Sequence, residues 1–167
     1  MNYHEVFSHL LGIPYVDGTD DCYGLCRRYY ADCYGLELPN YARSADFFSE
    51  GIDLISPFLL EEGFVVVDVP LDRLQIGDGL LISVRRRWMT QPGTINHVGV
   101  YVGNQSFLHH MYEKPSCEEA LTVQWKQRIT TVVRHPDVTD KNAVELGRRP
   151  TNILNLLPDH VKQRYGL

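Results

Sequence analysis

The chain has 167 residues, of which 44% are hydrophobic, and its formal net charge at pH 7 is −5. A single domain of this length can bury a core without disulfides or metals to hold it together. The negative charge excludes a surface built to follow nucleic-acid phosphates, and the one basic run, residues 85–87 (RRR), is expected to be a solvated loop.

The sequence predicts no membrane span and no signal peptide, so the chain is expected to be made in a cytoplasm. Its first residues, MNYHEVFSHLLGIPY, lack a basic leader followed by a long apolar run, and no later window reaches about 18 uninterrupted apolar residues. A reducing compartment rarely keeps structural disulfides, so the four cysteines are expected to be free thiols.

Helical patterns occupy the first part of the chain. They predict a short helix over residues 3–11, a second from about Cys22 to Tyr34 and a third over residues 44–62. Pro57 is expected to break the third helix, because a proline in a helix interior removes a hydrogen bond and clashes with the preceding turn.

The second of these helices has the clearest boundaries. Asp20 or Asp21 is the expected N-cap, and Gly35 is the expected C-cap. Side chains at spacings of three and four should form one buried stripe along it. The stripe consists of Cys22, Leu25, Cys26, Tyr29 and Cys33.

The pattern then changes to runs of β-branched and alternating residues. The runs GFVVVDV, DGLLISV, HVGVYVG, SFLHHMY and RITTVVRHP predict antiparallel strands, with a hairpin around Gly103 and Asn104. Helices followed by strands indicate an α+β domain, in which N-terminal helices pack on one side of a small curled antiparallel sheet. We place this domain at residues 1–137. Residues 138–167 are expected to be a C-terminal appendage with a short amphipathic helix.

Cys22 is a candidate nucleophile because of its place at the start of the second helix. A cysteine in the first turn faces unpaired backbone amides and the positive end of the helix dipole, which both favour a thiolate with a lowered pKa. A nearby imidazole would complete the activation, because thiolate and imidazolium stabilise each other.

The predicted strands supply candidate histidines. Successive side chains alternate between the faces of a strand, so only one of the adjacent His109 and His110 can share the face of His97. The valines of HVGVYVG mark the apolar face, and Leu108 should join them, which places His109 with His97 and turns His110 away. This register needs an odd-length turn, such as the three residues 103–105. A nucleophile, a base and an orienting group would then face one another.

Two other interpretations of the cysteines stay open beside this one. A cysteine on a helix stripe is most often a core residue, which is the expected role of Cys26, Cys33 and Cys117. A zinc site made by Cys22, Cys26, Cys33 and a histidine is less favoured, because the gaps between these cysteines do not match the usual zinc knuckle.

Short segments between about Leu11 and His110 resemble, in their order, those of a known family. They are Pro14-Tyr15, Gly18, DCYGL at residues 21–25, Gly77-Asp78, HVGVYVG at residues 97–103 and FLH at residues 107–109. Together they are similar to the NlpC family of cell-wall cysteine peptidases.

The resemblance implies a papain-like NlpC-type fold and a peptidase site without metal or cofactor. In that site Cys22 would be the nucleophile, His97 the general base and His109 the orienting third residue. The residues implied to bind substrate or to shape the site are Tyr15, Asp21 and Tyr23. Family members typically cleave amides of peptidoglycan stem peptides, often between D-glutamate and a diamino acid.

A narrower likeness concerns DCYGLCRRYY and RITTVVRHP, which look like the NlpC-type domain of tail-assembly proteins from lambda-like phages. It implies a place in the virion tail, tail-tip proteins and the peptidoglycan stem peptide as partners, and a role in opening the cell wall. Two alternatives stay open. The chain would otherwise be a tail assembly or structural protein with a peptidase-like fold, or a protease that processes a tail protein.

The sequence also departs from the family pattern. Tyr23 stands where serine is usual, and Gly79 is expected to interrupt the strand after Gly77-Asp78. The segment between Tyr15 and Cys22 is short, and the linker over residues 85–96 is long. These positions border the expected cleft, so they bear on the choice of substrate.

Overall fold

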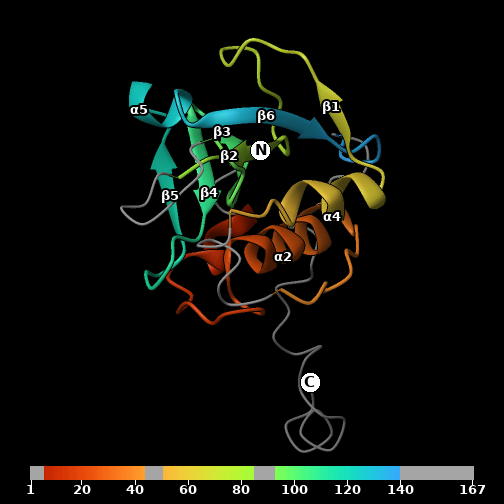
Figure 1. Ribbon diagram of the computed structural model, residues 1–167, viewed down its shortest axis with the longest axis vertical. Helices are drawn as coiled ribbons and strands as arrows, with labels where there is room; N and C mark the ends of the chain where they lie inside the picture. Colours follow the sequence, from red (N-terminus) through yellow and green to blue (C-terminus); the bar gives the residue numbers. More distant parts are fainter. Residues whose placement is uncertain (1–5, 44–50, 85–92, 140–167) are drawn as a thin grey trace, which may run out of the picture.

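The computed structural model describes residues 6–43, 51–84 and 93–139 (Figure 1). The predictions for residues 85–87 and for residues 140–167 of the appendage lie outside these described residues. The helices are η1 (Ser8–Leu10), α2 (Cys22–Tyr34), α4 (Ile55–Glu61) and α5 (Val123–Lys126). The strands are β1 (Val65–Val67), β2 (Gly79–Ile82), β3 (His97–Gly103), β4 (Ser106–His109), β5 (Cys117–Ala120) and β6 (Ile129–Arg134).

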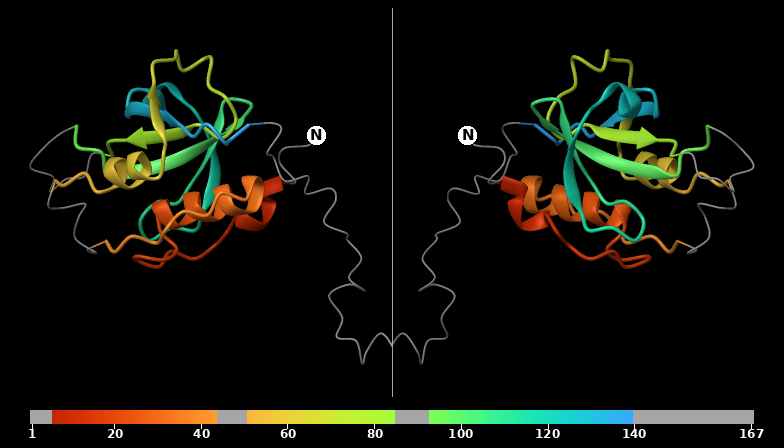
Figure 2. Two further views of the ribbon diagram at one scale, coloured as in Figure 1. Left: turned by 90° about the vertical axis from the view of Figure 1, so that its right-hand side faces the viewer. Right: turned by 90° about the vertical axis from the view of Figure 1, so that its left-hand side faces the viewer.

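The strands form one six-stranded antiparallel sheet in the order β1-β6-β2-β3-β4-β5. Figure 1 shows α2 lying beneath this sheet, and Figure 2 shows from two further sides how the strands curl above the helix. The predicted α+β class with a small curled antiparallel sheet is therefore confirmed. None of the helices in the described ranges is long and apolar enough to cross a membrane.

Helix α2 begins and ends where its capping residues predict. The side chain of Asp21 accepts a hydrogen bond from the amide of Gly24 at 2.8 Å, and Gly35 ends the helix in the left-handed conformation with φ of 66°. Every side chain of the predicted stripe is buried. The stripe packs under the sheet and holds α2 along it.

The other N-terminal helices differ from the prediction. The described part of residues 3–11 ends as the 3-10 helix η1, and α4 occupies only the last part of residues 44–62. Pro57 does not break α4, because it is the third residue of that helix and first-turn amides have no intrahelical acceptor to lose. The carboxylate of Asp53 accepts hydrogen bonds from the first two amides of α4, at 3.1 and 2.9 Å.

Strands β1, β2, β3, β4 and β6 lie within the predicted runs, whereas β5 and α5 are not predicted by the sequence. β5 reads CEEA, which has neither apolar alternation nor β-branched residues, and only its pairing with β4 makes it a strand at the edge of the sheet. α5 has four residues, and its N-cap is Thr122, whose hydroxyl accepts a hydrogen bond from the amide of Trp125 at 3.4 Å. Elements this short leave no periodic pattern.

Two apolar clusters lie on the two faces of the sheet. The first contains the α2 stripe, the valines of β3 and Leu108. The second contains Tyr101 and Phe107 on the opposite face, covered by Trp125 of α5. Val138 is buried in the first cluster, so the packed core extends at least one residue beyond the predicted boundary at residue 137.

The hairpin between β3 and β4 has the predicted faces but another turn. Asn104 and Gln105 form a two-residue turn with φ of 50° and 54°, and the register shifts between Tyr101 and Gly103. An even turn and one extra residue on β3 together give the alternation that a three-residue turn would give. His109 therefore lies opposite Gly99, on the same face as His97.

Gly79 starts β2 and does not interrupt it, so this expectation is wrong. A Cβ atom at this position would lie 2.8 Å from Cγ2 of Val133 on the neighbouring strand. The glycine thus allows β2 and β6 to pack closely, with the hydroxyl of Tyr30 below them.

Candidate active site

The site is centred on a pair of histidines carried by neighbouring strands. His97 is the first residue of β3 and His109 is the last residue of β4. Nε2 of His97 lies 3.0 Å from Nδ1 of His109, and the side chains of both residues are buried. The predicted association of these two histidines is present in the structure.

The chain just before His97 is fixed by a buried side chain. The side-chain amide of Asn96 makes two hydrogen bonds with the backbone of Val84. Its Oδ1 accepts from the N–H of Val84 at 2.8 Å, and its Nδ2 donates to the carbonyl of Val84 at 2.9 Å. Asn96 thus extends the pairing between β2 and β3 by one side chain. It holds the start of β3, and with it the base candidate, in place.

Cys22 lies at the same end of β3, although α2 and the histidines occupy opposite faces of the sheet. A hydrogen bond from the backbone amide of Val98 reaches the sulfur of Cys22. Because Val98 directly follows His97, the sulfur stands beside the residue that carries the imidazole. His97 is the first residue of β3, so the Cys22 sulfur and His97 both lie at the beginning of this strand.

The position of Cys22 at the helix start does not lower its pKa as the sequence predicts. Burial, followed by the negative charge of Asp21, raises the pKa of the Cys22 thiol to about 12. Hydrogen bonds from the amides of Val98 and Tyr23 and the charge of Arg43 act in the opposite direction but are weaker. The cysteine by itself is therefore a thiol, and it needs a base to take its proton.

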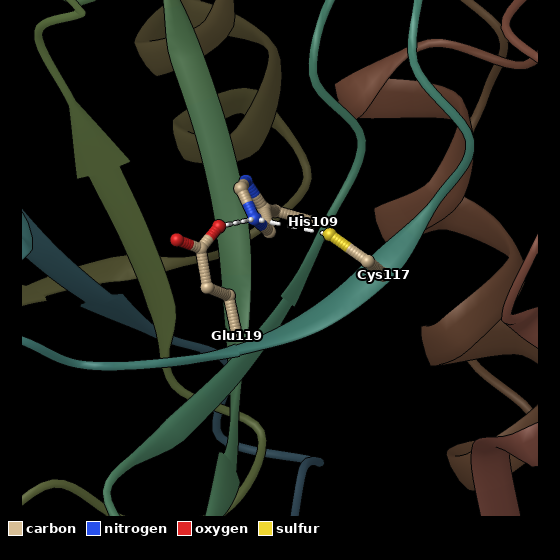
Figure 3. A group of neighbouring side chains, drawn as sticks. All are labelled: His109, Cys117 and Glu119. Carbon is tan, nitrogen blue, oxygen red and sulfur yellow. Dashed lines mark hydrogen bonds and ion pairs between the residues drawn. The ribbon is translucent and has the colours of Figure 1, made fainter.

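A carboxylate and an indole extend the histidine pair toward β5 and α5. Nε2 of His109 lies 3.0 Å from Oε2 of Glu119, and Nε1 of Trp125 donates to Oε1 of the same carboxylate at 2.9 Å. Cys117 lies two residues before Glu119 on the same face of β5, and its Sγ is 3.5 Å from Nε2 of His109. Figure 3 shows Cys117 and Glu119 approaching the ring of His109 from one strand.

The chemistry of the partners assigns the protons to the ring nitrogens. Burial lowers the pKa of His109, so its ring is neutral, and the carboxylate of Glu119 can only accept a hydrogen bond. Nε2 of His109 is therefore the protonated nitrogen, and Nδ1 accepts from Nε2–H of His97. Nδ1 of His97 is left as the basic nitrogen of the group.

Tyr15 and His110 pack against each other, and Tyr15 lies near the sulfur of Cys22. Their rings meet edge to face at 5.3 Å, and the charge of Cys22 is, after burial, the largest cause that raises the pKa of Tyr15. The Tyr15 hydroxyl and both ring nitrogens of His110 are buried. His110 is thus turned away from His97 as predicted, but it is not exposed.

Asp21 and Tyr23 support the helix start and do not face the histidines. The Asp21 carboxylate accepts from Nε and Nη2 of Arg43 at 2.8 and 3.0 Å, and the side chains of this ion pair are 4% and 1% exposed. Arg43 also lies over the ring of Tyr23, whose hydroxyl donates to the carbonyl of Pro39 at 3.2 Å. Both residues therefore brace the start of α2 on either side of Cys22 in the sequence, and a role in binding substrate stays a prediction.

The cysteines fall into two groups. Cys26 and Cys33 are buried on α2, which confirms their predicted core role, and burial raises the pKa of Cys26 well above its usual value. Cys117 is only half-buried and contacts His109, so the core role predicted for it is wrong. Among the described residues, the group with metal-ligand geometry is His109, Cys117 and Glu119, and it contains none of the three cysteines of α2.

Sequence reasoning missed four residues of the site, namely Arg43, Asn96, Glu119 and Trp125. Glu119 and Trp125 lie on the elements that the sequence does not predict. Asn96 directly precedes the predicted strand HVGVYVG, so its place at the strand start is visible in the sequence, but its side-chain pairing with Val84 is not. Nothing in the sequence connects Arg43 with Asp21, which precedes it by 22 residues.

The described residues form an α+β domain in which a helix-start cysteine stands beside a histidine pair on neighbouring strands. The model of the NlpC/P60 family matches residues 12–134. Because this match covers more than half of the chain, the chain belongs to the NlpC/P60 family.

Two phage proteins are similar to the chain in sequence. The tail tip assembly protein K of Escherichia phage lambda is 33% identical over 127 residues, which cover 76% of this chain and 59% of that protein. The tail tip assembly protein K of Escherichia phage N15 is 28% identical over 137 residues, which cover 80% of this chain and 52% of that protein. The chain thus spans about half or somewhat more of the length of these relatives.

Solved structures show the same fold at lower identity. An NlpC/P60 family protein from Bacillus cereus has a TM-score of 0.54 and 21% identity, and the match covers 80% of this chain and 39% of that one. A lipoprotein-like protein of the same family from Staphylococcus aureus has a TM-score of 0.51 and 19% identity, with 79% and 39% covered. At these identities the likeness concerns the fold alone.

Proposed function

We propose that the chain is a cysteine endopeptidase that hydrolyses amide bonds of peptidoglycan stem peptides, and that it acts as a phage tail component that opens the cell wall. The observation that carries the proposal is the chain of contacts from Glu119 through His109 to His97, which ends beside the sulfur of Cys22. Membership of the NlpC/P60 family supports the chemistry, and the names of the phage relatives support the location.

In the first half of the reaction, Cys22 transfers its proton to Nδ1 of His97 as its sulfur attacks the scissile carbonyl carbon. The imidazolium of His97 then donates that proton to the leaving amine, the carbon–nitrogen bond breaks, and a thioester remains on Cys22. Glu119 supports the positive charge through His109, since each ring in turn donates a hydrogen bond toward the carboxylate.

In the second half, His97 takes a proton from water as the water oxygen attacks the thioester. The carbon–sulfur bond breaks, the acid product leaves, and the proton returns to the sulfur. The oxyanion of each tetrahedral intermediate would be held by the backbone amide of Cys22 at the helix start. The hydroxyl of Tyr15 is the second donor that we assign to it, because it is buried and lies close enough to Cys22 for the charge of the sulfur to raise the pKa of Tyr15.

A second candidate function follows from the relatives' names, which describe assembly of the tail tip. In this case the chain would process a tail protein, or would serve as an assembly or structural protein with a peptidase-like fold. A protease that processes a tail protein would use the same site. Only the identity of the substrate can therefore distinguish these functions.

The experiment compares two substrates with two forms of the full chain. Wild type and Cys22→Ala are incubated with purified peptidoglycan and, separately, with the tail-tip proteins encoded beside the chain, and the products are analysed by mass spectrometry. Stem-peptide fragments released by wild type alone are expected. Cleavage of a tail protein alone would support the processing protease, and no Cys22-dependent cleavage of either substrate would leave the assembly role.

A further inference from the structure

We propose that His109, Cys117 and Glu119 form a binding site for a zinc-type divalent cation, distinct from the Cys22 sulfur, and that an ion there switches off the base His97. The cation site stands on the geometry of β4 and β5. The effect on the reaction rests on the proposed function.

The donor set is one that zinc prefers. An imidazole nitrogen, a cysteine sulfur and a carboxylate oxygen are supplied by one residue each, and the three atoms lie within 4.8 Å of one another. The cross-strand pair of His109 and Cys117 and the same-face spacing from Cys117 to Glu119 bring them together. The backbone of β4 and β5 therefore preorganises the site.

The distances agree with tetrahedral coordination. Zinc binds sulfur at about 2.3 Å and imidazole nitrogen at about 2.0 Å, which separates the two ligand atoms by about 3.5 Å at a tetrahedral angle. Sγ of Cys117 and Nε2 of His109 are 3.5 Å apart. Nε2 of His109 and Oε2 of Glu119 are 3.0 Å apart, so a small movement of the carboxylate would complete the third ligand.

The surroundings also favour a bound ion. The side chain of His109 is 0% exposed, whereas that of Glu119 is 47% exposed, so a cation can enter from the solvent side with water as its fourth ligand. Trp125 holds the other oxygen of Glu119, and Nδ1 of His109 contacts His97. A metal-bound histidine commonly has such a partner for its second nitrogen.

Binding would reverse the proton arrangement of the histidine pair. A cation on Nε2 of His109 moves the ring proton to Nδ1, which then donates to Nε2 of His97. The proton of His97 must then lie on Nδ1, the nitrogen that would take the thiol proton. Both rings stay neutral, and the proton of the Cys117 thiol is released to solvent.

The test measures binding of Co²⁺, a spectroscopic substitute for zinc, to the full chain carrying Cys22→Ala, which removes the nucleophilic sulfur. Saturable binding of one ion with a thiolate-to-cobalt absorption band is expected. Adding Cys117→Ser should remove the band and weaken binding by at least about 100-fold, and Glu119→Gln should weaken it by about tenfold or more. Glu118→Gln is the matched control, because Glu118 hydrogen-bonds Ser106 and points to the other face of β5.

The proposal is overturned if the Cys22→Ala chain binds no Co²⁺, or if Cys117→Ser leaves the band and the affinity unchanged. Circular dichroism of each variant shows whether it is folded. In a peptidase assay, Zn²⁺ should inhibit wild type at concentrations that leave Cys117→Ser active. The binding measurement needs no activity, so failure of the proposed function would not be mistaken for failure of the cation site.

Discussion

His109 and His110 are consecutive residues with different neighbours. His109 contacts His97, Glu119 and Trp125, whereas His110 packs against Tyr15 on the side of α2. In the proposed mechanism His109 orients the base His97, whereas His110 packs beside Tyr15 near Cys22. Replacing each histidine separately should distinguish these two roles.

His109→Ala should lower kcat by at least about tenfold, because the ring of His97 loses the acceptor that orients it. His109→Asn should recover part of the loss, since its side-chain oxygen can accept at about the place of Nδ1. His110→Ala should instead lower stability by about 2 kcal/mol, because removing a buried ring leaves a cavity beside Tyr15. Steady-state kinetics and urea unfolding of each variant measure the two effects. A kcat that falls more in His110→Ala than in His109→Ala would contradict the assignment.

In the proposed mechanism Glu119 is a positioning residue, because it would act on the reaction through His109. Glu119→Ala should lower kcat by about tenfold with little change in KM, since it removes the acceptor that fixes the tautomer and the charge that supports the imidazolium. Trp125→Phe keeps the carboxylate and should have a smaller effect. Unchanged kcat in Glu119→Ala, measured across pH 5–8, would mean that the histidine pair needs no carboxylate.

At this scale the sequence predicts the residues that lie on periodic elements. Cys22 follows from the helix start, and His97 and His109 follow from strand alternation beside the valines. Glu119 and Trp125 do not follow, because β5 and α5 are stabilised by tertiary pairing and packing and carry no pattern of their own. The sequence predicts a lowered pKa for Cys22, because the helix dipole favours a thiolate. The pKa is raised instead, because the cost of burying the thiolate charge is larger.

At the scale of elements, the start of α2 depends on a buried ion pair between Asp21 and Arg43. Asp21 also accepts from the amides of Gly18 and Gly24, so one carboxylate joins the loop before the helix to the helix itself. A Cβ on Gly24 would lie 1.8 Å from the carbonyl oxygen of Thr19, which shows how closely this loop approaches. The loop carries Tyr15, so the ion pair also positions this side chain.

Arg43→Ala should lower the free energy of unfolding by about 3–5 kcal/mol, because it leaves the Asp21 carboxylate buried without a counter-ion. Arg28→Ala is the matched control, since Arg28 pairs with Asp20 at an exposed position and its loss should cost less than about 1 kcal/mol. Urea unfolding monitored by tryptophan fluorescence gives both values. Similar losses in the two variants would show that the pair around Asp21 does not stabilise the helix start.

In the hairpin of β3 and β4, the predicted faces of the side chains are correct although the predicted turn length is wrong. Sequence alternation specifies that His97 and His109 share a face, because the valines and Leu108 must be buried together. It does not specify whether a three-residue turn or a two-residue turn with an extra residue on β3 produces that register. Both solutions satisfy the hydrophobic pattern, and only the backbone distinguishes them.

At the scale of the whole molecule, two buried histidines couple stability to pH. Burial lowers the pKa of His109 and of His110 below the ordinary 6.5. Above that value both folded and unfolded states are neutral, and below it the unfolded state binds more protons, so stability falls as pH falls. The loss begins near pH 6.5 and continues to the lowered pKa of each folded histidine.

The melting temperature of the full chain should therefore decrease between pH 6.5 and pH 5. The decrease should be smaller in His110→Asn, because asparagine has no proton to bind in this range. Differential scanning calorimetry at intervals of pH measures both curves. Parallel curves for wild type and variant would show that His110 is protonated as readily in the folded state as in the unfolded one.

The central claim is that the Cys22 thiol, with His97 as its base, carries out amide hydrolysis. The most direct measurement is the rate of release of stem-peptide fragments from purified peptidoglycan by wild type, Cys22→Ala and His97→Ala, with folding checked by circular dichroism. We predict release by wild type and a loss of several orders of magnitude in both variants. Release by folded Cys22→Ala at the wild-type rate would contradict the account.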